Sequence, residues 1–320
     1  MTIVDIRTID WELDEHHHDL SDPKSIQVTY NRLCDWLAQC RAELPPAAWH
    51  EFCHRFREHP LADMLCRDPF IVRALTKPRG YAGDAVLLDM AYRLHEPSTQ
   101  HLDPITALLN QATLNRPAIK AARWRRRTLS EQLDHYATRY ANPTMVSVAA
   151  GHLREIADSQ SVHDGLYADI WALDQDRESL DVIDHDYRHL GVHTQQTSVA
   201  EIIAAGHTPG APTDIITSSG LYDYLDRYTA ATLTTALINS LRPGGTLLIA
   251  NVAPFQDAAL LEAAMDWFLI ERTATQMLQL LDHVPKARIS KPTLFSDSNH
   301  IVTFLEVSAK SGIPWPVPSE

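Results

Sequence analysis

A turn of small residues and an acid roughly 20 positions after it are the parts of this chain best suited to binding a ligand. Segment 145–149 is apolar enough for a buried strand, and Ala149, Ala150 and Gly151 lead it into a tight turn. A second apolar stretch ends at Asp174, where a carboxylate of a βαβ unit can accept hydrogen bonds from ribose hydroxyls. Because a pyrophosphate needs a closer backbone approach than one glycine allows, the turn favours a nucleoside cofactor over NAD.

Both positions also have a purely structural explanation. Gly151 can belong to an ordinary strand-to-helix turn, but a helix starting there would direct its free N–H groups and its positive end at the ligand, so we favour a binding role. Asp174 can cap the helix that follows it, and that role is compatible with ribose binding. We therefore predict that Gly151 and Asp174 serve one cofactor.

Two kinds of sequence must position these residues. Between about Ser25 and Ala141, apolar residues recur every three or four positions, which predicts a helical N-terminal domain over residues 1–141. After Pro143, short apolar runs alternate with amphipathic stretches, which predicts an α/β domain over 142–320 with a parallel sheet and a C-terminal tail. We expect strands at 145–149, 168–173, 192–197, 213–218, 245–251, 286–290 and 299–307.

The composition disfavours several classes of function. The 320 residues carry a formal net charge of -13, which disfavours a broad phosphate-binding surface, so we expect no nucleic-acid partner. Apolar runs stay below the roughly 20 residues that span a bilayer, and the acidic N-terminus lacks the pattern of a signal peptide. These features predict a cytoplasmic protein without a membrane partner.

Cysteine and histidine are not spaced as metal ligands. His50 and His54 flank Cys53, but with 17 histidines some fall near cysteines by chance, so we predict no metal. The three histidines at 16–18 lie in an acidic leader that we interpret as disordered and solvated. Reduced, mostly buried thiols are expected at Cys34, Cys40, Cys53 and Cys66.

Two further motifs follow in the α/β domain. Strand 214–218 continues into Ser-Gly-Leu-Tyr-Asp-Tyr-Leu, and Arg-Pro-Gly-Gly at 242–245 precedes the fifth strand. In this order the motifs resemble class I S-adenosylmethionine-dependent methyltransferases, a likeness that runs from Pro143 to the end. It implies a Rossmann-like, seven-stranded methyltransferase domain with S-adenosylmethionine as cofactor. The residues that the resemblance places at the cofactor are Ala149, Gly151, Asp174, Gln175, Ser198, Val199 and Ser218.

The same resemblance implies individual roles. Asp174 would hold both ribose hydroxyls, and Gln175 would lie beside the adenine. Ser198 and Val199, after the third strand, match positions that border the adenine ring, although an ordinary loop explains them equally well.

A second resemblance narrows the family. Lys-Pro-Arg-Gly-Tyr-Ala-Gly-Asp at 77–84, Arg-Trp-Arg-Arg-Arg at 123–127 and segment 265–273 are similar to the branch of 3-hydroxypalmitic acid methyl ester biosynthesis enzymes, in which a helical domain precedes the catalytic one. The likeness implies that 77–84 is a lid, in which the ring of Tyr81 faces the sulfonium and Asp84 pairs with the cofactor ammonium. A structured loop between helices is the alternative.

Arginines and aromatics extend the predicted site. Arg123, Arg126 and Arg127 share one helix face, which is either solvated or supplies a fork for the methionine carboxylate, and we prefer Arg123. Tyr222 follows the fourth strand at the edge where open α/β sheets bind ligands, so it is a candidate for shaping the acceptor pocket and for catalysis. Equally, 221–225 can begin the apolar face of the next helix.

Three hypotheses of function follow. The first is an S-adenosylmethionine-dependent enzyme of secondary metabolism that methylates a small-molecule or lipid-like acceptor, which it mainly orients. The second is intramolecular, because azetidine-2-carboxylate synthases resemble methyltransferases in fold: the amino group of the cofactor attacks its own γ-carbon and releases methylthioadenosine. The third, suggested by the reduced glycine motif, is a non-catalytic S-adenosylmethionine-binding module. The acceptor and the oligomeric state stay open.

Overall fold

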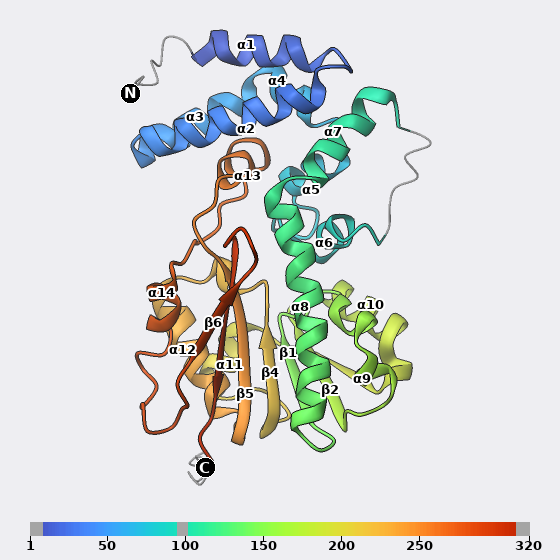
Figure 1. The fold of residues 1–320 in the computed structure, drawn as a ribbon, viewed down its shortest axis with the longest axis vertical. Helices are drawn as coiled ribbons and strands as arrows, with labels where there is room; N and C mark the ends of the chain where they lie inside the picture. Colours follow the sequence, from blue (N-terminus) through green and yellow to red (C-terminus); the bar gives the residue numbers. More distant parts are fainter. Residues whose placement is uncertain (1–8, 95–101, 312–320) are drawn as a thin grey trace. The chain divides into compact units, whose positions relative to one another are not determined.

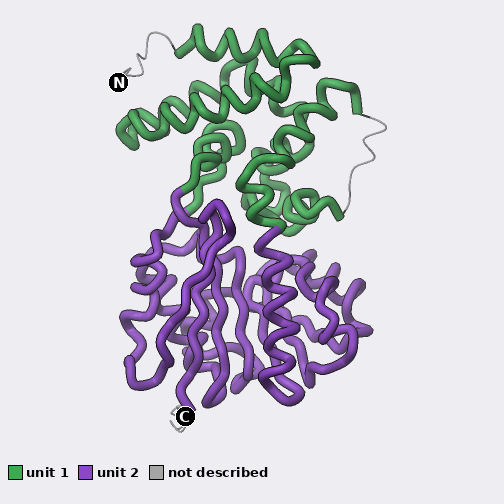
Figure 2. The backbone as a smooth tube through the Cα atoms, viewed as in Figure 1, with its two compact units in different colours: residues 1–123, 255–269 green, residues 124–254, 270–320 purple. Residues whose placement is uncertain are grey.

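The computed structural model describes residues 9–94 and 102–311, and the chain divides into two compact units (Figure 1, Figure 2). Unit 1 consists of residues 1–123 and 255–269, and unit 2 of residues 124–254 and 270–320.

This division differs in two ways from a boundary at 141/142. It falls inside the long helix α8, Pro117–Arg139, and segment 255–269 returns to unit 1 late in the sequence. Most of the expected C-terminal tail lies outside the described residues.

Unit 1 is built from helices, as the apolar spacing predicted. Five helices begin with a proline, which the first turn tolerates because its backbone nitrogen has no partner within the helix. The helices before α8 are α1 Ile9–Leu20, α2 Ile26–Glu43, α3 Pro46–Glu58, α4 Pro60–Leu65, α5 Pro69–Thr76, α6 Ala85–Ala91 and α7 Pro104–Leu114.

Helix α13, Ala258–Met265, supplies a central part of the core of unit 1. All eight of its residues are buried, and it packs against α2, α3 and α5. Its one acid, Glu262, and its N-cap residue, Asp257, are held within the same unit: Asp257 accepts hydrogen bonds from Arg116, and Glu262 from Arg41. This alanine- and leucine-rich helix therefore completes a core whose other helices come from the first 123 residues.

The three histidines at 16–18 lie in helix α1, so the prediction of a disordered leader is wrong. The ring of His16 lies 5.6 Å from that of Trp36, and only 2% of His16 is exposed. Burial lowers the pKa of His16 to about 4, and the charge of Arg32 acts in the same direction. The acidic composition hid an apolar stripe of spacing four, three and four, formed by Ile9, Leu13, His16 and Leu20.

Unit 2 contains a seven-stranded sheet of order β3-β2-β1-β4-β5-β7-β6 (Figure 1). The pairs among β1 to β5 are parallel, and β7 is antiparallel to both β5 and β6. The predicted α/β class with a Rossmann-like seven-stranded sheet and a helical N-terminal region is confirmed. The strands are β1 Thr144–Val148, β2 Asp169–Asp174, β3 Val192–Gln196, β4 Thr213–Ser218, β5 Leu241–Val252, β6 Thr293–Ser296 and β7 Val302–Ser308.

The expected strand at 286–290 is wrong. The N–H of Arg288 donates to the carbonyl of Pro285 and closes a turn, and Ile289 forms only an isolated bridge with Ala309. The edge strand β6 starts further on, at Thr293. Within 286–290 Ile289 alone is buried, and the local sequence does not distinguish such a turn from a paired strand.

Helices cover both faces of the sheet. On one face, Val146, Leu247 and Leu305 share a core with residues of the helices α11, α12 and α14. On the other face α8 lies against β7, where the hydroxyl of Tyr136 donates to Glu306 at 2.9 Å. The remaining elements of unit 2 are η3 Arg154–Asp158, α9 Gln160–His163, α10 Arg177–Tyr187, η4 Arg188–Leu190, α11 Val199–Ala205, η5 Tyr222–Tyr224, α12 Arg227–Asn239 and α14 Ala274–Gln279.

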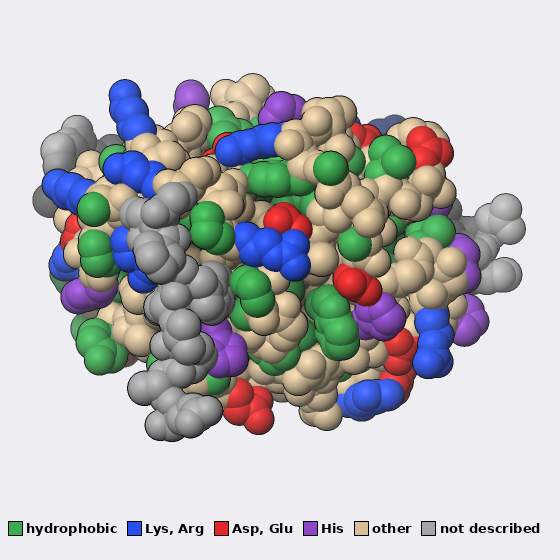
Figure 3. Space-filling model, turned by 90° about the horizontal axis from the view of Figure 1, so that it is seen from below, with side chains coloured by type: hydrophobic (Ala, Val, Ile, Leu, Met, Phe, Trp, Pro, Cys, Tyr) green, Lys and Arg blue, Asp and Glu red, His purple; other side chains and the backbone are tan. Residues whose placement is uncertain are grey.

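Across the face drawn in Figure 3, acidic, basic and histidine side chains are interspersed with hydrophobic ones. Among the described residues, no helix combines the length and the apolar character that crossing a membrane requires.

Candidate active site at the sheet edge

The turn after β1 has a backbone conformation that residues other than glycine rarely adopt. Ala149, Gly151 and Leu153 have φ values of 54°, 55° and 51°, in the left-handed region. The N–H of Ala150 donates to the carbonyl of Leu173 at 3.1 Å, which joins the turn to the end of β2. A left-handed alanine costs energy that the surrounding structure must offset, and such strain is concentrated at binding sites.

The helix expected to start at Gly151 is not there, so that prediction is wrong. Within the described residues 149–163 the chain forms only the short helices η3 and α9. Neither offers the long axis that a helix dipole argument requires. The case for binding at Gly151 therefore rests on the conformation and contacts of the turn itself.

Asp174 joins this turn to the loop after β2. Its Oδ2 accepts the N–H of Gly151 at 2.8 Å, and its Oδ1 accepts the N–H of Asp176 at 2.9 Å. Burial, with 7% of the residue exposed, raises the pKa of Asp174, while these N–H donors act in the opposite direction. The capping alternative is wrong, because Asp176 is the N-cap of α10 and accepts the N–H of Glu178.

Three buried hydroxyls at the carboxyl ends of β3 and β4 have no hydrogen-bond partner within the described part of the chain. They belong to Thr197, Thr217 and Ser218. A buried polar group left without a partner costs about 1–3 kcal/mol, which a ligand can offset. Ser218 was predicted as a cofactor contact; Thr197 was missed, although it directly precedes the predicted Ser198.

Ser198 begins helix α11 with a reciprocal cap. Its side chain accepts the N–H of Glu201, and the carboxylate of Glu201 accepts the N–H of Ser198 at 2.7 Å. Nearby, the carbonyl of Gln175 accepts a hydrogen bond from Gln196 at 3.0 Å. These contacts fix the loops after β2 and β3, and the placement of Gln175, Ser198 and Val199 beside an adenine stays a prediction.

The loop after β4 carries a buried carboxylate, Asp223. Its Oδ1 accepts the N–H of Val252, and its carbonyl accepts the N–H of Ile270 at 2.7 Å. Burial raises the pKa of Asp223, and the charge of Arg125 acts in the opposite direction. Asp223 is thus an ionisable group held at the edge where Rossmann-like sheets bind ligands.

Tyr222, in the same loop, is fully buried. Its hydroxyl lies 2.9 Å from the hydroxyl of Thr234, and its ring belongs to the core beneath the sheet. This burial favours the packing interpretation of residues 221–225, and a catalytic role for Tyr222 stays a prediction.

Arg272 holds the loop after β4 in place. Only 4% of Arg272 is exposed, and its guanidinium donates to the carbonyls of Tyr222 and Leu225 and to Oδ1 of Asn251. It therefore ties the loop to the end of β5. Residue-type and motif arguments gave Arg272 no role, because its partners are two backbone carbonyls and an amide oxygen and include no charged side chain.

Arg125 is the arginine of the 123–127 run that the sequence argument missed. It lies on the buried face of α8 with Thr128 and Leu129, and 8% of it is exposed. A Cβ built on Gly220 would lie 3.9 Å from its guanidinium, so Arg125 lies against the turn after β4. An arginine at a core position of a helical period was the available signal.

Arg125 also acts on two acids, the buried Asp223 and the partly buried Glu155. Burial raises the pKa of Glu155, in the segment after β1, and the charges of Arg125 and Arg126 act in the opposite direction. The charge of Arg125 acts in the same direction on the pKa of Asp223. One guanidinium therefore stabilises the ionised carboxylates of two loops at the sheet edge.

The arginines predicted to share one face do not act together. Arg123 belongs to unit 1 and donates to the last carbonyls of α6 and α7, each at 2.7 Å. Arg126 donates to the carbonyl of Arg154 in unit 2, and the side chain of Arg127 is 69% exposed. A role for Arg123 at the methionine carboxylate stays a prediction, and these contacts give it a structural function.

Segment 77–84 lies in unit 1 between α5 and α6. Asp84 is fully buried and caps α6 through the N–H of Leu87 at 2.8 Å, while its two oxygens accept from Arg73 at 3.0 and 2.7 Å. Lys77 pairs with Asp266 at 2.6 Å. These bonds favour the structured-loop alternative for Asp84, and the lid roles of Tyr81 and Asp84 stay predictions.

The histidines, cysteines and acids of the described ranges are the possible metal ligands, and the cysteines also carry the thiols. In the ranges that the structure describes, no three histidine, cysteine, aspartate or glutamate side chains are grouped to hold a metal ion. All four cysteines are free thiols, and burial raises the pKa of Cys34, Cys40 and Cys53 to about 12, far above the range of reactive thiolates.

The fold is similar to those of solved structures. A protein from Bordetella parapertussis described as possibly exported matches with a TM-score of 0.59 and 17% identity, over 91% of this chain and 97% of that chain. Magnesium protoporphyrin IX methyltransferase from Synechocystis matches with a TM-score of 0.48 and 10% identity, over 75% of this chain and 98% of that chain. A putative O-methyltransferase from Nostoc punctiforme matches with a TM-score of 0.46 and 14% identity, over 77% of this chain and 72% of that chain. No family model and no curated protein matches this chain.

Proposed function

We propose that this chain is an S-adenosylmethionine-dependent enzyme of the class I methyltransferase fold that methylates a small-molecule or lipid-like acceptor. The observation that carries the proposal is the hydrogen bond of 2.8 Å from the N–H of Gly151 to Asp174, which unites the two motifs of the sequence. It lies at the carboxyl edge of β1 and β2, next to the point where the strand order reverses between β1 and β4. Ligands of open α/β sheets bind at such a switch point.

The residues around this edge fit a nucleoside cofactor. A carboxylate can accept about four hydrogen bonds, more than the backbone N–H groups supply to Asp174, so Asp174 is our ligand for the ribose hydroxyls. The hydroxyls of Thr197 and Ser218, without partners in the described ranges, can serve the polar groups of the same ligand. Small residues at 149–151 let a ligand approach the backbone.

When bound here, S-adenosylmethionine supplies a methyl group carried on a positively charged sulfur. The sulfur is a good leaving group, because it departs as a neutral thioether. The residues of the chain then have three tasks. Asp174 orients the ribose, and Arg125 is our candidate for the methionine carboxylate, because a buried guanidinium offers a planar fork of donors. Asp223, whose pKa is raised by burial, is our candidate for receiving a proton from the acceptor.

The test is to incubate the purified full-length protein with S-adenosylmethionine, alone and with a panel of hydroxyl, carboxyl and amine acceptors, and to identify the products by mass spectrometry. A methylated acceptor together with S-adenosylhomocysteine supports the proposal. Methylthioadenosine with azetidine-2-carboxylate from the cofactor alone would replace it with the cyclase: the amino nitrogen bonds to the γ-carbon and loses a proton as the carbon–sulfur bond breaks. Binding without turnover would leave a binding module, and absence of binding would overturn all three.

A further inference from the structure

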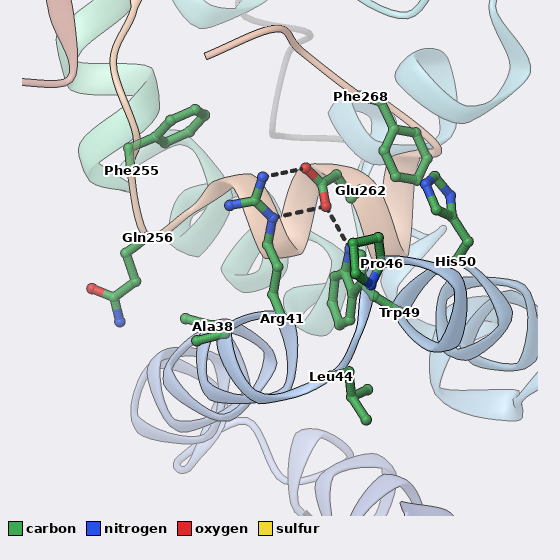
Figure 4. Close-up of a pocket in the computed structure, with 11 residues that line it drawn as sticks. Ala38, Arg41, Leu44, Pro46, Trp49, His50, Phe255, Gln256, Glu262 and Phe268 are labelled. Atoms are coloured by element: carbon green, nitrogen blue, oxygen red, sulfur yellow. Dashed lines mark hydrogen bonds and ion pairs between the residues drawn. The ribbon is translucent and has the colours of Figure 1, made fainter. Parts of the chain in front are cut away.

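A pocket of about 350 Å³ lies within unit 1 and shares no residue with the proposed cofactor site (Figure 4). Its walls come from α2, α3 and segment 255–269, all parts of the same unit. The volume falls at the lower end of the range of about 300–1,000 Å³ that is typical of small-molecule sites.

One side of this pocket is aromatic. The rings of His50 and Phe268 are stacked, with centroids 4.8 Å apart and 23° between their planes. Phe268 is 37% exposed, which is unusual for a phenylalanine and leaves ring surface for a ligand. Pro46 and Trp49 line the pocket near this pair in Figure 4. A flat apolar body therefore has a surface to pack on.

The polar centre of the pocket is an ion pair. Two nitrogens of Arg41 donate to the carboxylate of Glu262 at 2.9 and 2.8 Å, and the indole N–H of Trp49 donates to the same carboxylate. The side chain of Glu262 is 6% exposed, whereas that of Arg41 is 29% exposed. Among the described lining residues these two bear the formal charges, so the charge that a ligand can reach is positive.

We propose that this pocket is a second small-molecule site, which binds an amphipathic monoanion with an aromatic body and one carboxylate. The carboxylate lies at the guanidinium of Arg41, and the ring packs against His50 and Phe268. Charge complementarity selects the anion, and the volume limits its body to one or two rings. The site stands independently of the proposed function of unit 2.

The test is a calorimetric titration of the full-length protein with indole-3-acetate and, as a neutral isostere, indole-3-acetamide. We expect one site per chain and an affinity for the acetate about tenfold higher, as befits a hydrogen bond to a charged group. Phe268→Ala should weaken acetate binding several-fold. Removal of Arg41 would leave Glu262 buried without its cation and risks unfolding, so a different variant tests the location.

Ala42→Phe fills the pocket from an exposed position of α2 and should weaken acetate binding at least tenfold. Ala47→Phe, at an exposed position of α3 that does not line the pocket, is the matched control and should leave binding unchanged. Binding that persists in saturating S-adenosylmethionine supports a separate site. Loss of binding under that saturation, equal affinity for acetate and acetamide, an unaffected Ala42→Phe variant, or no binding of either probe would each overturn the proposal.

Discussion

At the scale of single residues, Asp174 combines two functions in one carboxylate. It holds the turn after β1 through Gly151 and the loop after β2 through Asp176. The capacity that remains on its oxygens points to ribose hydroxyls. Order and spacing singled out Gly151 and Asp174, because these motifs are local, and the family resemblance added Ser218; their binding of a cofactor stays a prediction. It did not predict the left-handed backbone of Ala149, since alanine rarely adopts it.

Asp174→Asn should lower the affinity for S-adenosylmethionine about ten- to a hundredfold, because an amide replaces a charged acceptor with a donor. In the wild type, affinity should also fall as the pH is lowered through the raised pKa of Asp174, since the ionised form accepts the ribose hydroxyls. Calorimetry measures both effects. Asp176→Asn is the control, as asparagine caps helices well. Equal losses in the two variants would contradict a specific role for Asp174.

Ser218→Ala removes a hydroxyl without a partner in the described ranges, so the thermal midpoint should stay the same or rise. The affinity for S-adenosylmethionine should nevertheless fall several-fold. Ser240→Ala should instead lower the thermal midpoint, because the Ser240 hydroxyl accepts the N–H of Thr208 and donates to the carbonyl of Ala236. We expect it to cost about 1 kcal/mol of stability with unchanged affinity. A destabilised Ser218→Ala variant with normal affinity would make that hydroxyl structural.

At the scale of elements, helix α8 carries the candidate cation of the site. Arg125 faces the turn after β4, whereas Arg127 is exposed on the same helix. The spacing of arginines predicted a shared face but not which arginine is buried, because that depends on the sheet that α8 covers. The strand expected at 286–290 is absent for a related reason: strand pairing depends on a neighbouring strand, which the local sequence does not specify.

Arg125→Gln should weaken binding of S-adenosylmethionine about tenfold, because the candidate fork for the methionine carboxylate is lost. Arg127→Gln, the matched exposed substitution, should change neither affinity nor stability. Calorimetry well below the melting temperature separates binding from folding. An Arg125→Gln variant that melts earlier yet binds normally would restrict Arg125 to balancing the charges of Glu155 and Asp223.

Helix α1 should make unit 1 sensitive to acid. The pKa of His16 is about 4 in the folded state and 6.5 in the unfolded state, so unfolding takes up a proton between these values and stability falls as the pH drops from about 6.5 to 4. The full loss is on the order of 3 kcal/mol. His16→Phe should flatten the pH dependence of the melting temperature, and the exposed His18→Phe should not. Parallel curves for wild type and His16→Phe would contradict this account.

At the scale of the whole molecule, the fold class was predictable and the division into units was not. Alternating apolar runs predicted a parallel sheet covered by helices, because each strand and helix carries its own period, and the family resemblance implied its Rossmann-like, seven-stranded form. The apolar residues of helix α13 also predict its burial, but they do not predict that it packs against α2 and α3, about 200 positions earlier in the sequence. Packing between distant segments is set by shape and charge, as in the pair of Arg41 and Glu262.

The central claim is that the sheet edge around Gly151 and Asp174 binds S-adenosylmethionine. The most direct measurement is an isothermal titration of the full-length protein with S-adenosylmethionine at neutral pH, with circular dichroism of the same sample to verify folding. We predict saturable binding of one molecule per chain. A folded sample that shows no saturable binding up to millimolar cofactor would contradict the account.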